Sequence, residues 1–154
     1  MKRTIAALAA VSAALLSATV LASGAVAGAT ACIPGVKAIN GVSARTFCGP
    51  AKATVKVNGK TISYTGGACS TNIGLFSVNI GTVALGTLKH APEYLGVTAK
   101  AKAGTQSRQT IAVVHAGRTE AIIGTVTIKA GLKQGTFAGK VFGSPEAISG
   151  SFTC

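Results

Sequence analysis

"ATVKVNGKTISYT", residues 53 to 65, carries the clearest structural signal in this sequence. Its centre, Asn58-Gly59, suits a two-residue type I′ turn, because both central positions of that turn need a positive φ. Such a turn places alternate side chains of the flanking segments on one face: Ala53, Val55, Val57, Ile62 and Tyr64. The polar side chains face the other way, so the stretch predicts a β-hairpin with one buried side.

Further short apolar runs follow the hairpin and predict an all-β fold. They span residues 75–80, 83–88, 94–102, 109–114, 121–129, 136–142 and 147–153. Regular short strands with Gly-rich turns between them are typical of antiparallel sandwiches and barrels, so we expect an antiparallel β-sandwich or half-barrel. The alternative is an α+β fold with one short helix around 91–102, which the Ala and Lys content favours and Gly96, Val97 and Thr98 oppose.

The N-terminal segment has the organisation of a secretory signal peptide. Lys2 and Arg3 form a basic start, residues 4–21 are apolar, and "AVAGATA" offers A-x-A cleavage sites after Ala27 and Ala31. A retained transmembrane anchor is the alternative, since the apolar run approaches bilayer-spanning length. We predict a signal peptide over 1–27, with cleavage as late as 31 as a variant. A disulfide-looped segment over 28–50 and a single β-rich domain over 51–154 then follow.

All four cysteines, Cys32, Cys48, Cys69 and Cys154, follow this signal region. An even count in a small exported domain predicts two disulfides, for which three pairings exist. We favour Cys32–Cys48, which closes a short loop containing Gly and Pro, and Cys69–Cys154, which ties the final strand to an early one. The predicted location is secreted or extracellular, including association with the cell envelope.

The charge balance is strongly basic. Removing Lys2 and Arg3 from the 15 basic side chains leaves 13 against three acids, Glu93, Glu120 and Glu146, and hence a net charge near +10. Such an excess attracts anionic envelope polymers or lipid headgroups, although it can also serve solubility alone. The candidate contacts for an anionic partner are Lys56, Lys60, Lys100, Lys102, Arg108, Arg118, Lys129, Lys133 and Lys140.

The residues typical of enzymes, metal sites and specific nucleic-acid recognition are missing from the sequence. His90 and His115 fall in predicted turns without the ligand cluster that a metal needs. His90 and Glu93 lie three residues apart and are the nearest approach to an acid–base pair, but a role in a surface turn is favoured. Several of the seven aromatic residues sit at core-like positions, so only weak, sequence-independent nucleic-acid binding is expected. We expect no catalytic residues, no metal and no cofactor.

Several short motifs occur in a characteristic order: "VKVNGK", "GGAC", "FSVNIG", "HAPEYLGV", "GTFAGKVFG" and a final "SFTC". This order resembles the mycobacterial nineteen-kilodalton lipoprotein antigen family of actinobacterial exported envelope proteins, over roughly residues 52–154. The resemblance implies a β-rich exported domain, a disulfide matching Cys69–Cys154 and a non-enzymatic envelope role. Two departures are Ala29, where the lipobox before Cys32 expects a Leu-like residue, and the absence of a Thr/Ser-rich tether. Lipidation of Cys32 would also leave Cys48 unpaired, so a soluble form is favoured over a lipid-anchored one.

We therefore expect a non-enzymatic secreted or cell-envelope protein that acts as a surface antigen or adhesion-like binding module. One alternative is a carrier of a hydrophobic ligand, such as a lipid or glycolipid, in a β-sheet cavity. Another is a secreted inhibitor of a partner protein. An elongated apolar cavity would favour the carrier, and a solid core with a protruding rigid loop would favour the inhibitor.

Overall fold

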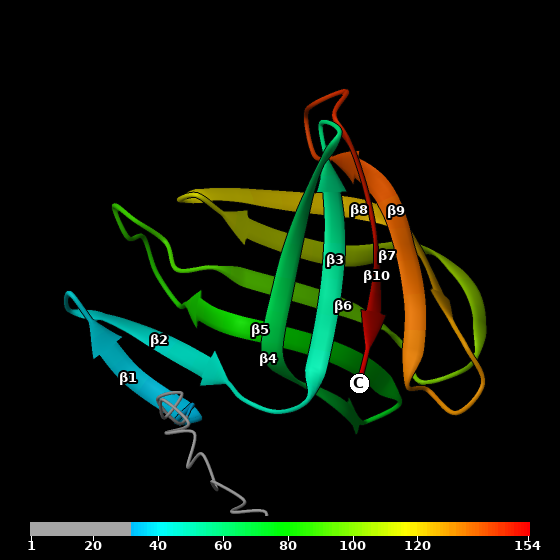
Figure 1. The fold of residues 1–154 in the computed structure, drawn as a ribbon, viewed down its shortest axis with the longest axis horizontal. Helices are drawn as coiled ribbons and strands as arrows, with labels where there is room; N and C mark the ends of the chain where they lie inside the picture. Colours follow the sequence, from blue (N-terminus) through cyan, green and yellow to red (C-terminus); the bar gives the residue numbers. More distant parts are fainter. Residues whose placement is uncertain (1–31) are drawn as a thin grey trace, which may run out of the picture. The chain divides into compact units, whose positions relative to one another are not determined.

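Ten antiparallel strands form one continuous sheet in residues 32–154, the part of the chain that the computed structural model describes (Figure 1). The strands are β1 (Gly35–Ile39), β2 (Val42–Phe47), β3 (Ala51–Val57), β4 (Lys60–Asn72), β5 (Leu75–Ala84), β6 (Tyr94–Lys100), β7 (Gly104–His115), β8 (Arg118–Ile128), β9 (Gln134–Val141) and β10 (Ala147–Thr153). The described part contains no helix long and apolar enough to cross a membrane. The predicted signal peptide and both of its cleavage sites lie outside the described residues.

Strands β3 to β10 close into an eight-stranded up-and-down barrel. Each strand pairs with the next one in sequence, and β10 then pairs back with β3 from Ile148↔Val57 to Thr153↔Lys52. The predicted all-β, antiparallel fold is confirmed, and its sheet is a closed barrel. Closure leaves no unpaired edge between the first and last barrel strands, which removes a template for unwanted strand addition.

Successive connections of an up-and-down barrel lie at alternate ends, which defines two groups of turns here. The mouth end, as we call it, carries the turns at 58–59, 85–93, 116–117 and 142–146. The opposite end carries the turns at 73–74, 101–103 and 129–133, together with the C-terminal residue. In Figure 1 the β3–β4 turn and the β9–β10 connection meet at the top of the view, and the C-terminus lies well below them.

Inward-facing side chains fill the middle of the barrel. Along β3 the side chains alternate between buried and exposed, as the hairpin pattern predicts. The rings of Phe76, on β5, and Phe152, on β10, pack 5.7 Å apart. The Phe152 ring also occupies the space that a side chain at Gly135 would need, and Phe137 does the same over Gly150. These aromatic–glycine contacts make the centre a packed core in which small and large residues interdigitate.

Two predictions of local structure are wrong. Residues 83–88 are not a separate strand, because β5 runs unbroken to Ala84 and residues 85–93 form a connection. Gly81, with a φ of 92°, lets the strand bend without ending, so its turn-like sequence was misleading. The alternative helix around 91–102 is also wrong, since β6 pairs with β5 and β7 over this segment. Residues 94–97 are buried on both faces, which removes the alternation expected of a strand.

Residues 32–50 contribute a hairpin, β1–β2, that the sequence did not predict. Its turn, Asn40-Gly41, has positive φ at both positions, and β2 pairs with the far end of β5 from Ala44↔Ala84 to Phe47↔Gly81. Phe47 also packs against Tyr94 at 6.1 Å between ring centroids. The hairpin therefore belongs to the same sheet as the barrel.

Both predicted disulfides are confirmed. Cys32–Cys48 joins the segment before β1 to the link between β2 and β3, and Cys69–Cys154 joins β4 to the C-terminal residue. No cysteine in the described part is free. Two disulfides in a domain of this size are compatible with an extracellular location.

Candidate functional site

A hollow of about 320 Å³ opens at the mouth end of the barrel. Its apolar wall is made by Val57, Ile62 and Val113, whose side chains continue the barrel core toward solvent. Its polar rim is made by Asn58, Lys60, His115, Arg118, Glu120 and Glu146, and Ala116 completes the lining. The volume lies at the lower limit of pockets that hold small organic molecules.

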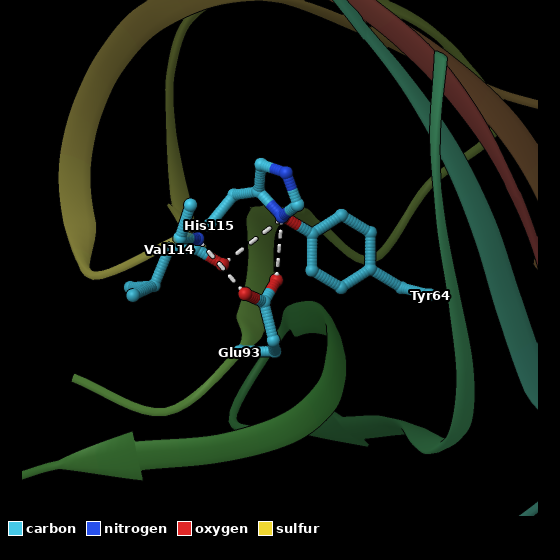
Figure 2. Close-up of polar contacts among 5 residues, drawn as sticks. Tyr64, Glu93, Val114 and His115 are labelled. Carbon is cyan, nitrogen blue, oxygen red and sulfur yellow. Dashed lines mark hydrogen bonds and ion pairs between the residues drawn. The ribbon is translucent and has the colours of Figure 1, made fainter. Parts of the chain in front are cut away.

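Glu93 and His115 form an ion-pair contact beside this hollow (Figure 2). Glu93 directly precedes β6 and His115 ends β7, so the pairing of Tyr94 with Val114 brings them side by side. Glu93 Oε2 lies 2.8 Å from His115 Nδ1, and Glu93 Oε1 accepts the Ala116 N–H at 2.9 Å. The Glu93 carboxylate thus secures the β7–β8 turn. The sequence had pointed to His90 as the histidine nearest to Glu93, but the partner in the structure is His115.

Tyr64 reaches across the same end from β4. Its hydroxyl donates to the Val114 carbonyl at 3.1 Å, and its side chain is almost fully buried (Figure 2). Burial raises the pKa of Tyr64 well above its ordinary value, and the nearby Glu93 carboxylate raises it further. Burial also raises the pKa of Tyr94, whose hydroxyl donates to Asn79 Oδ1 at 2.6 Å.

These pKa shifts predict a loss of stability at alkaline pH. In the unfolded chain a tyrosine ionises near pH 10, whereas folding keeps Tyr64 and Tyr94 protonated beyond it. The unfolded state therefore binds fewer protons above pH 10, so the free energy of unfolding falls as pH rises through that range.

A near-ultraviolet titration tests this expectation. The chain has only two tyrosines, so tyrosinate absorbance should appear only when circular dichroism reports unfolding. The same titration in denaturant should give a single ordinary tyrosine curve and serves as the control. Ionisation of either tyrosine near pH 10 with the fold intact would contradict the structure.

All three acidic side chains of the sequence lie at the mouth end, and each has a polar partner there. Glu120 accepts a hydrogen bond from Arg118 at 2.9 Å, and Glu146 accepts one from the Asn58 amide at 2.8 Å. Together with the Glu93–His115 contact, these interactions give every carboxylate side chain a hydrogen-bond partner. The mouth end therefore combines three hydrogen-bonded carboxylates with basic side chains such as Lys60 and Arg118.

The opposite end carries only basic charged side chains. Five exposed lysines, here called the lysine end, surround its turns: Lys52, Lys100, Lys102, Lys129 and Lys133. Lys52 lies opposite Thr153 in the closing ladder, and the Lys133 carbonyl accepts the Cys154 N–H at 2.8 Å. In residues 32–154 no Asp or Glu side chain lies at this end, so the lysine end has excess positive charge.

Gln106 positions two of these lysines through their backbone. Its side chain is buried, with 6% of its surface exposed. Its Nε2 donates to the Lys100 and Lys102 carbonyls at 3.0 Å each, and its Oε1 accepts the Lys100 N–H at 2.8 Å. The β6–β7 turn, with its exposed lysines, is therefore braced from inside.

The barrel distributes the nine predicted basic contacts over three regions, and all nine are exposed. Lys100, Lys102, Lys129 and Lys133 lie at the lysine end, and Lys60 and Arg118 lie at the mouth end. Lys56 and Lys140 lie one residue inside the mouth-end termini of β3 and β9, and Arg108 lies on the outer wall. Sequence reasoning placed Tyr64 on the buried hairpin face without its hydrogen bond to Val114, and it missed Lys52 and the Glu93–His115 pair. No local signal marks them, because strand pairing alone brings them to their partners.

Within residues 32–154 no three His, Cys, Asp or Glu side chains lie close enough together to hold a metal ion. A scan against protein-family models, a search of curated proteins and a search of solved structures each gave no match for this chain. Its resemblance to the nineteen-kilodalton antigen family therefore stays a hypothesis based on motif order.

Proposed function

We propose that this protein is a non-enzymatic, exported binding module of the cell envelope that holds anionic polymers or headgroups through its lysine end. The supporting observation is that acidic side chains are confined to one end of the barrel. Every acidic side chain is at the mouth end with a partner, while the five lysines of the lysine end face solvent without a carboxylate side chain among them.

The chemistry of this surface favours many weak contacts over one specific pocket. Lysine is a hydrated point charge on a flexible stem, so it suits phosphate, sulfate or carboxylate groups spaced along a polymer. Several such charges on one face produce a positive field that raises the local concentration of an anionic partner. Because the lysines are exposed, salt at physiological strength screens that field over about 8 Å.

A comparison of two charge variants tests the proposal. One variant changes the five lysines of the lysine end to Gln; its control changes five other exposed lysines to Gln, namely Lys37, Lys56, Lys60, Lys89 and Lys140. Both lose the same net charge. On anionic glycopolymer beads at low salt, we expect the first to bind at least about tenfold more weakly than wild type and the control to change much less.

The salt dependence provides the second readout. Wild-type retention should fall steeply as salt rises to physiological strength, and the lysine-end variant should show a shallower dependence. Equal losses in the two variants would mean that net charge alone matters and would contradict a role for this end. No retention of wild type at low salt would reduce the charge to a solubility device.

The hollow at the mouth end supports a second candidate, a carrier of a small apolar or amphipathic ligand. Its apolar wall of Val57, Ile62 and Val113 could bury an acyl chain end, although the packed core limits its depth. Burial of apolar surface is barely changed by salt of this strength. Salt-insensitive uptake of an apolar fluorescent probe, undiminished in the lysine-end variant, would therefore favour the carrier.

A further inference from the structure

Four two-residue turns of this sheet share one backbone conformation but differ in sequence. Their first central residues have φ values between 47° and 50°, and each is followed by a glycine: Asn40-Gly41, Asn58-Gly59, Ile73-Gly74 and Ala116-Gly117. Asn tolerates this left-handed conformation, whereas a β-branched residue there is a genuine outlier. Ile73 is thus the residue least suited to its own turn.

Packing does not explain the strained isoleucine. Ile73 is 92% exposed, the highest value among the exposed large hydrophobic side chains of the described residues. Leu75, two residues later, points outward from β5 and is 47% exposed. We call residues 72–75 the Ile73 tip. A side chain that is both strained and solvated suggests a role outside the folded monomer.

The Ile73 tip lies beside the lysine end. Leu75 is the cross-strand partner of Lys100, and the Gly74 carbonyl accepts the Ala101 N–H at 2.8 Å. Lys102 follows directly, and its N–H bonds to the Lys100 carbonyl. Two exposed apolar side chains are therefore flanked by two exposed lysines on one rim.

The exposed apolar residues of the mouth end have different surroundings. Phe142, in the β9–β10 connection, is 78% exposed, but this end also holds Glu93, Glu120 and Glu146. Acidic and basic side chains are mixed at the mouth end, so an apolar group there lacks the purely basic surroundings of the Ile73 tip. Phe142 consequently provides a matched control.

We propose that the Ile73 tip inserts Ile73 and Leu75 into the interfacial layer of an anionic phospholipid bilayer, while the lysine end contacts the headgroups. This inference rests on the proposed function and names its partner. Peripheral membrane binding strengthens with buried apolar area and with attraction of lysines to anionic lipid, and the tip supplies both on one rim. Lysine stems also extend along apolar surface while their charges stay at headgroup level.

Vesicle flotation with Ile73→Asn tests the insertion. The vesicles contain equal parts phosphatidylcholine and phosphatidylglycerol, with pure phosphatidylcholine as the uncharged arm. Wild type should float with the anionic vesicles only, and Ile73→Asn should bind them about tenfold more weakly, because it loses a buried apolar side chain. Phe142→Ser, which removes an exposed apolar residue from the mouth end, should bind as wild type does.

Stability measurements test whether a folding defect causes the weaker vesicle binding of Ile73→Asn. Asn suits a left-handed turn position better than Ile, so Ile73→Asn should raise the unfolding midpoint by roughly 3 °C. A variant that is more stable but binds membranes less well would show that Ile73 is kept for binding. A lower midpoint would overturn the strain on which the inference depends.

A tryptophan reporter tests directly whether the Ile73 tip enters the bilayer. The chain contains no tryptophan, so a single introduced indole gives the whole signal. Leu75→Trp places a single indole on a strand position of the Ile73 tip, and Phe142→Trp places one at the mouth end. Anionic vesicles should shift the emission of Leu75→Trp to the blue and leave Phe142→Trp unchanged. A shift in the second reporter alone would place the membrane contact at the wrong end and overturn the inference.

Binding to glycopolymer beads and binding to lipid vesicles are measured separately, so failure of this inference can be distinguished from failure of the proposed function. The bilayer inference is overturned if wild type binds the glycopolymer beads but not the vesicles. It is also overturned if Ile73→Asn binds the vesicles as well as wild type does. Either result leaves the proposed function standing. Absence of binding to both supports at low salt overturns both.

Discussion

Removal of the Cys69–Cys154 disulfide is expected to lower the free energy of unfolding by about 4.6 kcal/mol. The bond joins β4 to the last residue and closes a loop with a sequence separation of 85. Without it the unfolded chain gains the conformational freedom of that loop, while β10 must hold the barrel closed through hydrogen bonds and packing alone. A loss of this size approaches the whole stability of an ordinary domain, about 5–15 kcal/mol.

Urea unfolding of Cys69→Ala/Cys154→Ala, compared with Cys32→Ala/Cys48→Ala, measures the effect. The second bond closes a loop with a sequence separation of 16 outside the barrel, so its removal should cost about 3.1 kcal/mol. Circular dichroism in the absence of urea shows whether each variant still folds. A larger cost for the Cys32–Cys48 bond would contradict the assignment of Cys69–Cys154 as the bond that secures barrel closure.

Phe152→Ala is expected to destabilise the protein by about 3–5 kcal/mol. Phe152 lies on the closing strand, is 2% exposed, and packs against Phe76 and over Gly135. Because Gly135 has no side chain to move into the vacated space, the backbone of β9 cannot refill the cavity without shifting. The substitution thus removes buried apolar area and leaves a void.

Phe142→Ala provides the matched control for this core substitution, because the same chemical change is made where the ring is 78% exposed. Its effect should stay within about 0.5 kcal/mol, and both values come from the same urea titrations. Similar losses for the two variants would mean that the aromatic contacts at the centre of the barrel do not stabilise it.

The elements that could be predicted from sequence are those whose signal is local. The Asn58-Gly59 turn and the alternation along Ala53–Val57 predicted a hairpin, and β3 and β4 form it with the expected register. Even cysteine number and the position of each cysteine relative to loops and strands favoured the two bonds that the structure contains. These inferences depend on backbone preferences within a few residues or on the chemistry of a single residue type.

Local patterns failed where another strand determines the environment of a residue. Residues 94–97 lost their alternation because they are covered on both faces, so a helix remained an alternative there. Gly81 looked like a turn, yet it bends a strand that β6 holds in place through Gly81↔Tyr94. Tertiary contacts override local propensity at such positions.

Sequence alone determined an antiparallel all-β chain with a basic surface and two disulfides. Only the tertiary structure decided that the sheet closes, because closure depends on Ile148–Thr153 meeting Lys52–Val57 from the other end of the domain. Closure also decides where the charges lie: alternate connections of an up-and-down barrel fall at opposite ends, so the three acids gather at the mouth end and five lysines gather at the other. The same rule sets the strained Ile73 beside Lys100 and Lys102. The positions of these side chains depend on which strands pair. Strand pairing joins residues that are far apart in the sequence, so a short stretch of sequence cannot predict it.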